Sequence, residues 1–192
     1  MARVIYIKDT KEKNLLLLGV VEEGENARYT VNRALYSEIG MPYVGCELDS
    51  GAMEEVRAYD ELYRAKKKAL SLLSFADNSK RELKLKLLRA GFSSEVCEEC
   101  VREMEGLGYI KEERALERLI LLEAKKLRGP SRIIAQLSSK GYSSAMIRRI
   151  MSELCESGEL DFDEIKARLT ETKLPPDADE DDIKKLLYKQ GF

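Results

Sequence analysis

A short pattern occurs three times in the last two thirds of this chain, always at the same interval. In each copy a leucine stands four positions before a glycine, and an aromatic residue follows that glycine directly. The glycines are Gly91, Gly141 and Gly191, so the interval is 50 residues in both cases. A period of this length predicts stacked supersecondary units. Helical repeats of this kind usually present a surface to a macromolecule.

The aligned copies define the anatomy of one repeat unit. Two apolar residues at i and i+4 precede each glycine and share one helix face; they are Leu83/Leu87, Ile133/Leu137 and Ile183/Leu187. The glycine suits the left-handed residue that ends a helix, and Ser93 and Ser143 suit the cap of the next one. That helix has the same five apolar positions in the first two units: Val96, Cys97, Cys100, Val101 and Met104, aligned with Met146, Ile147, Ile150, Met151 and Leu154. With an opening helix in each unit, the pattern predicts three helices per repeat.

The first quarter of the chain has the pattern of β structure. Short apolar runs at residues 4–7 and 15–21, and a stretch of β-branched and aromatic character at residues 28–31, are separated by polar stretches that suit hairpin turns. Gly40, Pro42, Gly45 and Gly51 then follow one another closely, which disfavours long regular elements in that stretch. We expect a small N-terminal sheet module that ends near Gly51.

These observations predict a mainly α protein, in which tandem three-helix repeats form an elongated, curved array after a small N-terminal β module. The β module should occupy residues 1–51. A lead-in helix and the first repeat should occupy residues 52–110, and the second repeat residues 111–160. Residues 161–192 should form a third, incomplete repeat of about two helices. A break between helices is expected at residues 76–79, where Asp, Asn and Ser favour a turn and a helix cap.

Cys97 and Cys100 form a C-x-x-C pair, a spacing that zinc sites and thiol redox sites use. The repeat favours another interpretation, because the aligned residues of the next unit are Ile147 and Ile150. The chain also contains no histidine to complete a mixed zinc site. We therefore expect both cysteines to be buried core residues and no metal site to form.

No group of residues in the sequence has the pattern of an active site. Gly106 and Gly108 lack the preceding strand and the third glycine of a phosphate-binding loop, so they are interpreted as a helix end. The many carboxylates are expected on solvated helix faces. We expect neither an enzyme nor a bound cofactor.

Charge is unevenly distributed along the chain. The whole chain has a net charge of −2, yet Lys and Arg outnumber Asp and Glu in the second repeat, while acidic residues predominate in the third. The basic clusters could be ordinary solvated surface, or they could bind nucleic-acid phosphate or an acidic protein groove. The candidate contact residues are Lys66, Lys67, Lys84, Arg89, Lys125, Lys126, Arg128, Arg132, Arg148 and Arg149.

No apolar run approaches the roughly 20 residues that a membrane-spanning helix needs. The first residues also lack the apolar stretch of a secretory signal. We expect a cytoplasmic, monomeric protein that does not associate with membranes.

The repeat pattern resembles that of the RecX family of bacterial regulatory proteins. The resemblance rests on residues 82–92 (Glu-Leu-Lys-Leu-Lys-Leu-Leu-Arg-Ala-Gly-Phe), on residues 107–110 (Leu-Gly-Tyr-Ile), and on residues 132–141 (Arg-Ile-Ile-Ala-Gln-Leu-Ser-Ser-Lys-Gly). It extends from about residue 59 to residue 192. The N-terminal β module resembles, more weakly, an extension that many members carry.

The resemblance implies a function that composition alone does not indicate. RecX proteins bind the RecA recombinase and its filament on DNA, lie in the helical groove of that filament, and limit recombination, strand exchange and ATP hydrolysis in DNA repair and SOS control. They are not enzymes. The implied partners are therefore RecA, the RecA–DNA filament and possibly DNA itself. The alternative is a free-standing helical DNA-binding regulator that acts without RecA, because short three-helix units also occur in helix-turn-helix proteins.

Overall fold

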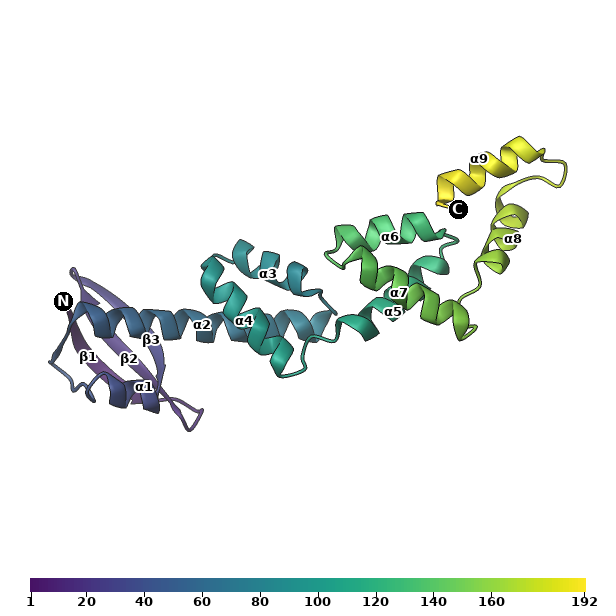
Figure 1. Ribbon diagram of the computed structural model, residues 1–192. Coiled ribbons are helices and arrows are strands. Elements are labelled where there is room, and N and C mark those ends of the chain that lie inside the picture. Colours follow the sequence, from purple (N-terminus) through teal and green to yellow (C-terminus); the bar gives the residue numbers. More distant parts are fainter. The chain divides into compact units, whose positions relative to one another are not determined.

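The computed structural model describes residues 1–192 and contains nine helices and one four-stranded antiparallel sheet (Figure 1). The predicted class, mainly helical with a small N-terminal sheet, is confirmed. The chain divides into two compact units, one of Met1–Ser71 with Leu87–Glu103 and the other of Leu72–Lys86 with Met104–Phe192. The elongated, curved arrangement and the repeat boundaries stay predictions. None of the helices combines the length and the apolar character needed to cross a bilayer.

The sheet of the first unit has the strand order β3-β2-β1-β4. Its strands are β1 (Ala2–Asp9), β2 (Leu15–Glu22), β3 (Glu25–Asn32) and the two-residue β4 (Glu47–Leu48). The three longer strands are those the sequence predicts. Helix α1 (Arg33–Glu38) and strand β4 were not predicted, because each is too short to show a periodic pattern. Asn32 starts α1 by accepting a hydrogen bond from the Leu35 N–H at 2.7 Å.

The core of this module forms between one face of the sheet and the start of a long helix, α2 (Ser50–Phe75). In β2 the side chains of Leu16, Leu18 and Val20 alternate along the strand and are all buried, as expected for a strand with one covered face. Met53 and Val56 of α2 belong to the same buried cluster. The sheet therefore depends on the first turns of α2 for its cover.

A β-bulge fixes the position of one aromatic ring on the sheet. The register of β1 against β2 shifts between Val4 and Tyr6, so that Tyr6 lies opposite Gly19. A Cβ atom added to Gly19 would lie 2.2 Å from Cε1 of Tyr6, far inside van der Waals contact. Only glycine leaves room for the ring at this position.

The edge strand β3 is protected by a buried acid from α2. The Thr30 N–H donates to Oδ1 of Asp60 at 2.8 Å, and Nε of Arg64 donates to Oδ2 of the same carboxylate at 2.7 Å. Asp60 is only 5% exposed. A charged group that occupies an outward-facing N–H of an edge strand hinders pairing with another strand.

Seven further helices follow α2, and the boundaries between them agree with the sequence pattern. They are α3 (Lys80–Arg89), α4 (Ser94–Gly106), α5 (Glu112–Ala124), α6 (Pro130–Ser139), α7 (Ser144–Glu156), α8 (Phe162–Lys173) and α9 (Glu180–Gln190). The predicted break at residues 76–79 lies between α2 and α3. Gly91, Gly141 and Gly191 adopt positive φ values of 93°, 96° and 90°, so the predicted left-handed helix ends are confirmed.

The aligned apolar residues form the interior of the repeats. Leu83, Leu87, Ile133 and Leu137 are fully buried. In the second unit of the chain one continuous cluster joins α5, α6 and α7 and extends to Ile165 of α8. Ile183 and Leu187, the aligned pair on α9, are only partly buried.

We predict that Gly19→Ala destabilises the N-terminal module. The added methyl group would collide with the Tyr6 ring, and a clash in a packed site costs about 1–3 kcal/mol. Urea unfolding followed by circular dichroism would measure the change. Gly106→Ala is the matched control: no atom lies within 4 Å of its added Cβ, so the variant should be at least as stable as the wild type. A wild-type midpoint for Gly19→Ala would contradict the close packing of the Tyr6 ring against Gly19.

Candidate protein-interaction surface

The candidate basic residues of the first compact unit differ in whether they already have a partner. Nζ of Lys66 lies 2.6 Å from a carboxylate oxygen of Glu103, and Nζ of Lys67 lies 3.2 Å from a carboxylate oxygen of Glu12. Arg89, at the end of α3, is exposed and forms no ion pair. Of these three candidates, Arg89 is the one whose charge is available to another molecule.

Two candidate residues meet at a buried carboxylate in the second compact unit. Glu123 of α5 is 2% exposed, and it accepts from Nζ of Lys126 at 2.8 Å and from the guanidinium of Arg128. Arg128 also donates to the side-chain oxygen of Gln136 on α6 at 3.0 Å. Burial by itself would raise the pKa of Glu123, but the Lys126 hydrogen bond and the Arg128 charge outweigh it and hold that pKa below its ordinary value. Lys126 and Arg128 therefore stabilise this junction between helices.

A related hydrogen bond occurs at the aligned positions one repeat earlier. There Nζ of Lys86 donates to the side-chain oxygen of Asn78, where the later repeat pairs Gln136 with Arg128. Lys86 aligns with Gln136 and Asn78 aligns with Arg128, so the donor and the acceptor have exchanged positions between the two repeats. Asn78 also donates to the Ala76 carbonyl at 2.7 Å and is buried. In both repeats, one hydrogen bond thus joins the residue just before the second helix, α3 or α6, to a side chain further along that helix.

Two further candidates hold parts of the second unit together. Arg132 of α6 donates to the Lys189 carbonyl at 3.0 Å and to the side-chain oxygen of Gln190 at 2.9 Å. Arg149 of α7 pairs with Glu113 of α5 and, at 2.9 Å, with Glu153 on its own helix. These guanidinium groups are engaged within the chain.

The remaining candidates of the second unit are Lys84, Lys125 and Arg148. Lys84 on α3 is half-buried and interacts with another group of the chain. Lys125 ends α5, and Arg148 lies on α7; both are exposed and form no ion pair. Within this unit, Lys125 and Arg148 are therefore the predicted contact residues whose charge is open to a partner.

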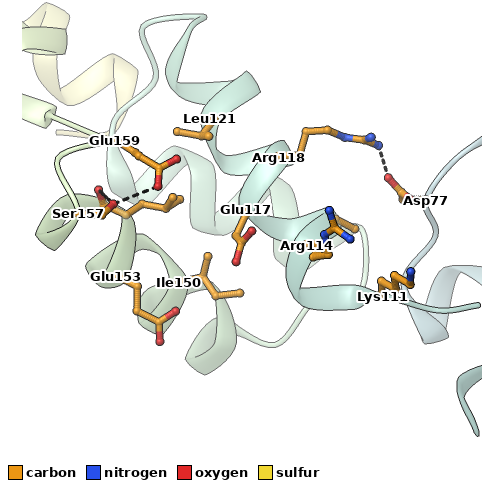
Figure 2. Close-up of a pocket in the computed structure, with 12 residues that line it drawn as sticks. Asp77, Lys111, Arg114, Glu117, Arg118, Leu121, Ile150, Glu153, Ser157 and Glu159 are labelled. Atoms are coloured by element: carbon orange, nitrogen blue, oxygen red, sulfur yellow. Dashed lines mark hydrogen bonds and ion pairs between the residues drawn. The ribbon is translucent and has the colours of Figure 1, made fainter. Parts of the chain in front are cut away.

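A hollow of about 690 Å³ lies along α5 and α7 and was not predicted from the sequence (Figure 2). Leu121 and Ile150 contribute apolar surface. The charged lining has both signs: Asp77, Lys111, Arg114, Glu117, Arg118, Glu153 and Glu159. Figure 2 shows Arg118 paired with Asp77 at one side of this hollow. Mixed charges around an apolar surface suit the side chains of a protein better than a row of phosphates.

The cysteine pair lies in the core, as the repeat predicts. Cys97 and Cys100 of α4 are fully buried. Burial raises the pKa of the Cys100 thiol to about 11, so the thiol is protonated at neutral pH and is a poor nucleophile and metal ligand. Nowhere in the chain do three or more metal-binding side chains form a cluster.

Tyr142, the aromatic residue after Gly141, is buried with an unpaired hydroxyl group. Its side chain is 5% exposed and its hydroxyl oxygen has no hydrogen-bond partner. Burial raises the pKa of Tyr142 to about 12, with a further contribution from the nearby Glu112 carboxylate. The aligned residues of the other repeats are Phe92 and Phe192, which have no hydroxyl to satisfy.

Together, these features define a helical repeat protein whose exposed faces carry charges of both signs and whose α5–α6 junction contains a buried ion pair. Residues 65–104 match the model of a family domain described as "RecX, first three-helix domain". The match covers the end of α2, all of α3 and most of α4.

Relatives and a solved structure extend this similarity. The chain is 29% identical over 121 residues to the regulatory protein RecX of Pseudomonas fluorescens (strain SBW25), covering 63% of this chain and 78% of that protein. It is 31% identical over 86 residues to the regulatory protein RecX of Pelodictyon phaeoclathratiforme, covering 44% and 54%. A crystal structure of regulatory protein RecX superposes over 100% of this chain and 95% of its own, with a TM-score of 0.73 and 18% identity, and so shares its fold. In sequence and in fold the chain is therefore similar to RecX proteins, as its repeat pattern predicts.

We predict that Arg128→Gln lowers stability by about 1–3 kcal/mol at pH 7, because it removes a charged partner from a buried carboxylate. The pKa of Glu123 is lower in the folded protein than in the unfolded chain, so its ionised form stabilises the fold at pH values above the unfolded-state pKa. This contribution to the free energy of unfolding is lost as the pH falls through the folded-state pKa. The difference between variant and wild type should therefore narrow below about pH 4. Urea unfolding of the variant and the wild type at pH 7 and below about pH 4 would measure this difference in stability. Lys125→Gln, at an exposed neighbouring residue, is the control. An equal loss at both pH values would exclude the electrostatic explanation.

We also predict that Tyr142→Phe raises stability by about 1 kcal/mol, because an unpaired buried hydroxyl is removed while the ring is kept. The pKa of Tyr142 is higher in the folded protein than in the unfolded chain, so the neutral side chain contributes its full stability at pH values below the unfolded-state pKa. This contribution to the free energy of unfolding is lost as the pH rises from about 10 to about 12. The advantage of the variant should grow over that range in denaturant titrations. Tyr188→Phe, at a tyrosine that is 85% exposed, should have no effect. A destabilised Tyr142→Phe would show that the hydroxyl has a partner.

Proposed function

We propose that this chain binds the RecA recombinase and its filament on DNA, and that it limits recombination, strand exchange and the linked ATP hydrolysis. The observation that carries the proposal is the similarity to RecX proteins, which includes the family's first three-helix domain. The protein acts by binding and not as an enzyme. We place this activity in the cytoplasm, where the protein is a monomer when dilute.

The repeat architecture supports this function on physical grounds. A RecA filament presents the same surface at regular intervals, and tandem units of similar structure can contact successive copies of it. In this proposal the units of contact are the first repeat at residues 52–110, the second at 111–160 and the shorter third at 161–192.

The distribution of ion pairs indicates which side chains are available for such contacts. Arg89, Lys125 and Arg148 are exposed without an ion pair, so binding a phosphate or a carboxylate breaks no internal interaction. Lys126 and Arg128 would have to leave the buried Glu123, which is costly. We therefore assign the contact to the first three residues and a structural role to the other two.

A DNA-dependent ATPase assay of RecA tests the proposal. The wild-type chain should inhibit hydrolysis, and Lys125→Glu/Arg148→Glu should need about tenfold more protein for half-inhibition, as expected for a loss of about 1.4 kcal/mol of binding free energy. The matched control is Lys11→Glu/Lys173→Glu, which changes the net charge equally at two other exposed residues without ion pairs.

Two outcomes would count against the proposal. Unchanged hydrolysis at a large excess of wild-type protein would contradict RecA binding. Tight, salt-sensitive binding to duplex DNA in the absence of RecA would favour the free-standing DNA-binding regulator instead.

A further inference from the structure

The second helices of successive repeats meet end to end within the second compact unit. Oγ of Ser79, at the start of α3, donates to the Lys140 carbonyl at the end of α6, at 2.7 Å. One repeat later, the Gly129 N–H at the start of α6 donates to the Gln190 carbonyl at the end of α9, at 2.8 Å. Ser79 and Lys140 align with Gly129 and Gln190, so the same two positions of the repeat make both contacts. Figure 1 shows the end of α9 beside the start of α6.

These contacts satisfy groups that every helix leaves unpaired. The first turn of a helix has free N–H groups and a partial positive charge, and the last turn has free carbonyls and a partial negative charge. The approach is close enough to require glycine: an added Cβ would lie 2.8 Å from Cβ of Arg81 at Gly141, and 2.6 Å from the Arg132 nitrogen at Gly191. The glycine motif of this chain is thus a docking surface for the start of another helix.

The first copy of this docking surface is unoccupied. Gly91 ends α3 with a φ of 93°, like Gly141 and Gly191, yet nothing lies within 4 Å of its added Cβ. Arg89, Ala90 and Gly91 are all exposed. The same motif therefore occurs three times, docked twice and open once.

One helix start in the repeat series is also open. Asp179 caps α9 at the position aligned with Ser79 and Gly129, and its side chain accepts from the Asp182 N–H at 2.8 Å. Asp179, Glu180 and Asp181 are exposed, and Asp181 forms no ion pair. The charges are complementary: the open helix end carries Arg89, and the open helix start is acidic.

We propose that the end of α3 in one copy of this chain binds the start of α9 in a second copy. Main-chain N–H groups of Asp179 and Asp181 would donate to the carbonyls of Ala90 and Gly91, as Gly129 and Ser131 donate to Gln190 and Gly191 within the chain. Arg89 would pair with Asp181. Because the two surfaces differ, the contact is heterologous and adds copies head to tail. It does not depend on RecA or DNA.

Sedimentation velocity of the protein alone tests this contact. At about 50 mM salt the average sedimentation coefficient of the wild type should rise as the protein concentration increases from about 10 μM to about 1 mM, and the rise should largely disappear at about 500 mM salt. Arg89→Glu and Asp181→Arg should each weaken association about tenfold or more. The double variant, Arg89→Glu/Asp181→Arg, exchanges the charges and should restore it.

A mixture of the two single variants distinguishes a head-to-tail contact from a symmetric one. Arg89→Glu keeps the wild-type start of α9, and Asp181→Arg keeps the wild-type end of α3, so a wild-type contact forms between the two variants, and a charge-exchanged contact forms between their altered ends. The mixture should therefore regain the growth with concentration that each single variant lacks, whereas a symmetric contact would stop at the dimer. Lys11→Glu is the control, since it reverses the charge of an exposed residue without an ion pair elsewhere, and it should associate like the wild type.

Two results would overturn the proposal. One is a wild-type protein that remains monomeric at about 1 mM and low salt. The other is an Arg89→Glu variant that associates as well as the wild type while circular dichroism shows unchanged helix content. Both substitutions are at exposed residues outside the buried core, so the variants should fold.

Discussion

Buried helix ends are the constraint on which the repeat region depends. A main-chain group that loses water must find another partner, and short helices expose many such groups for their length. This chain resolves the problem by placing the last carbonyls of one helix against the first turn of another, where the Ser79 hydroxyl donates in one contact and the Gly129 and Ser131 N–H groups donate in the other. That solution needs a left-handed glycine and close approach, which explains why the glycine interval is kept while most surface residues change.

Features with a repeating or periodic signal could be predicted from the sequence. The helix boundaries, the buried leucine and isoleucine pairs and the core position of Cys97 and Cys100 all follow from aligning the repeats. Helix α1 and strand β4 carry too few residues for a period, and their formation depends on tertiary contacts such as the cap provided by Asn32.

Contacts between charged side chains were much harder to predict, because residues distant in sequence must be placed to within a few ångströms. One signal was available. Glu123 interrupts the apolar stripe that includes Leu116 and Ile120, and an acid at such a position indicates a buried ion pair. Lys126 and Arg128 are close enough in sequence to be its partners. Arg149 and Glu113 gave no such sign, because both are on exposed faces.

The arrangement of the N-terminal module also bears on how the chain folds as it is synthesised. Strands β1, β2 and β3 are hairpin neighbours, and the helix residues that cover them, Met53 and Val56, follow soon after. Nearly all contacts of the module are therefore made between segments that leave the ribosome together, and such local topologies fold rapidly. The module can be complete before any of the three glycine motifs has been translated, so each later repeat is added to a part that is already folded.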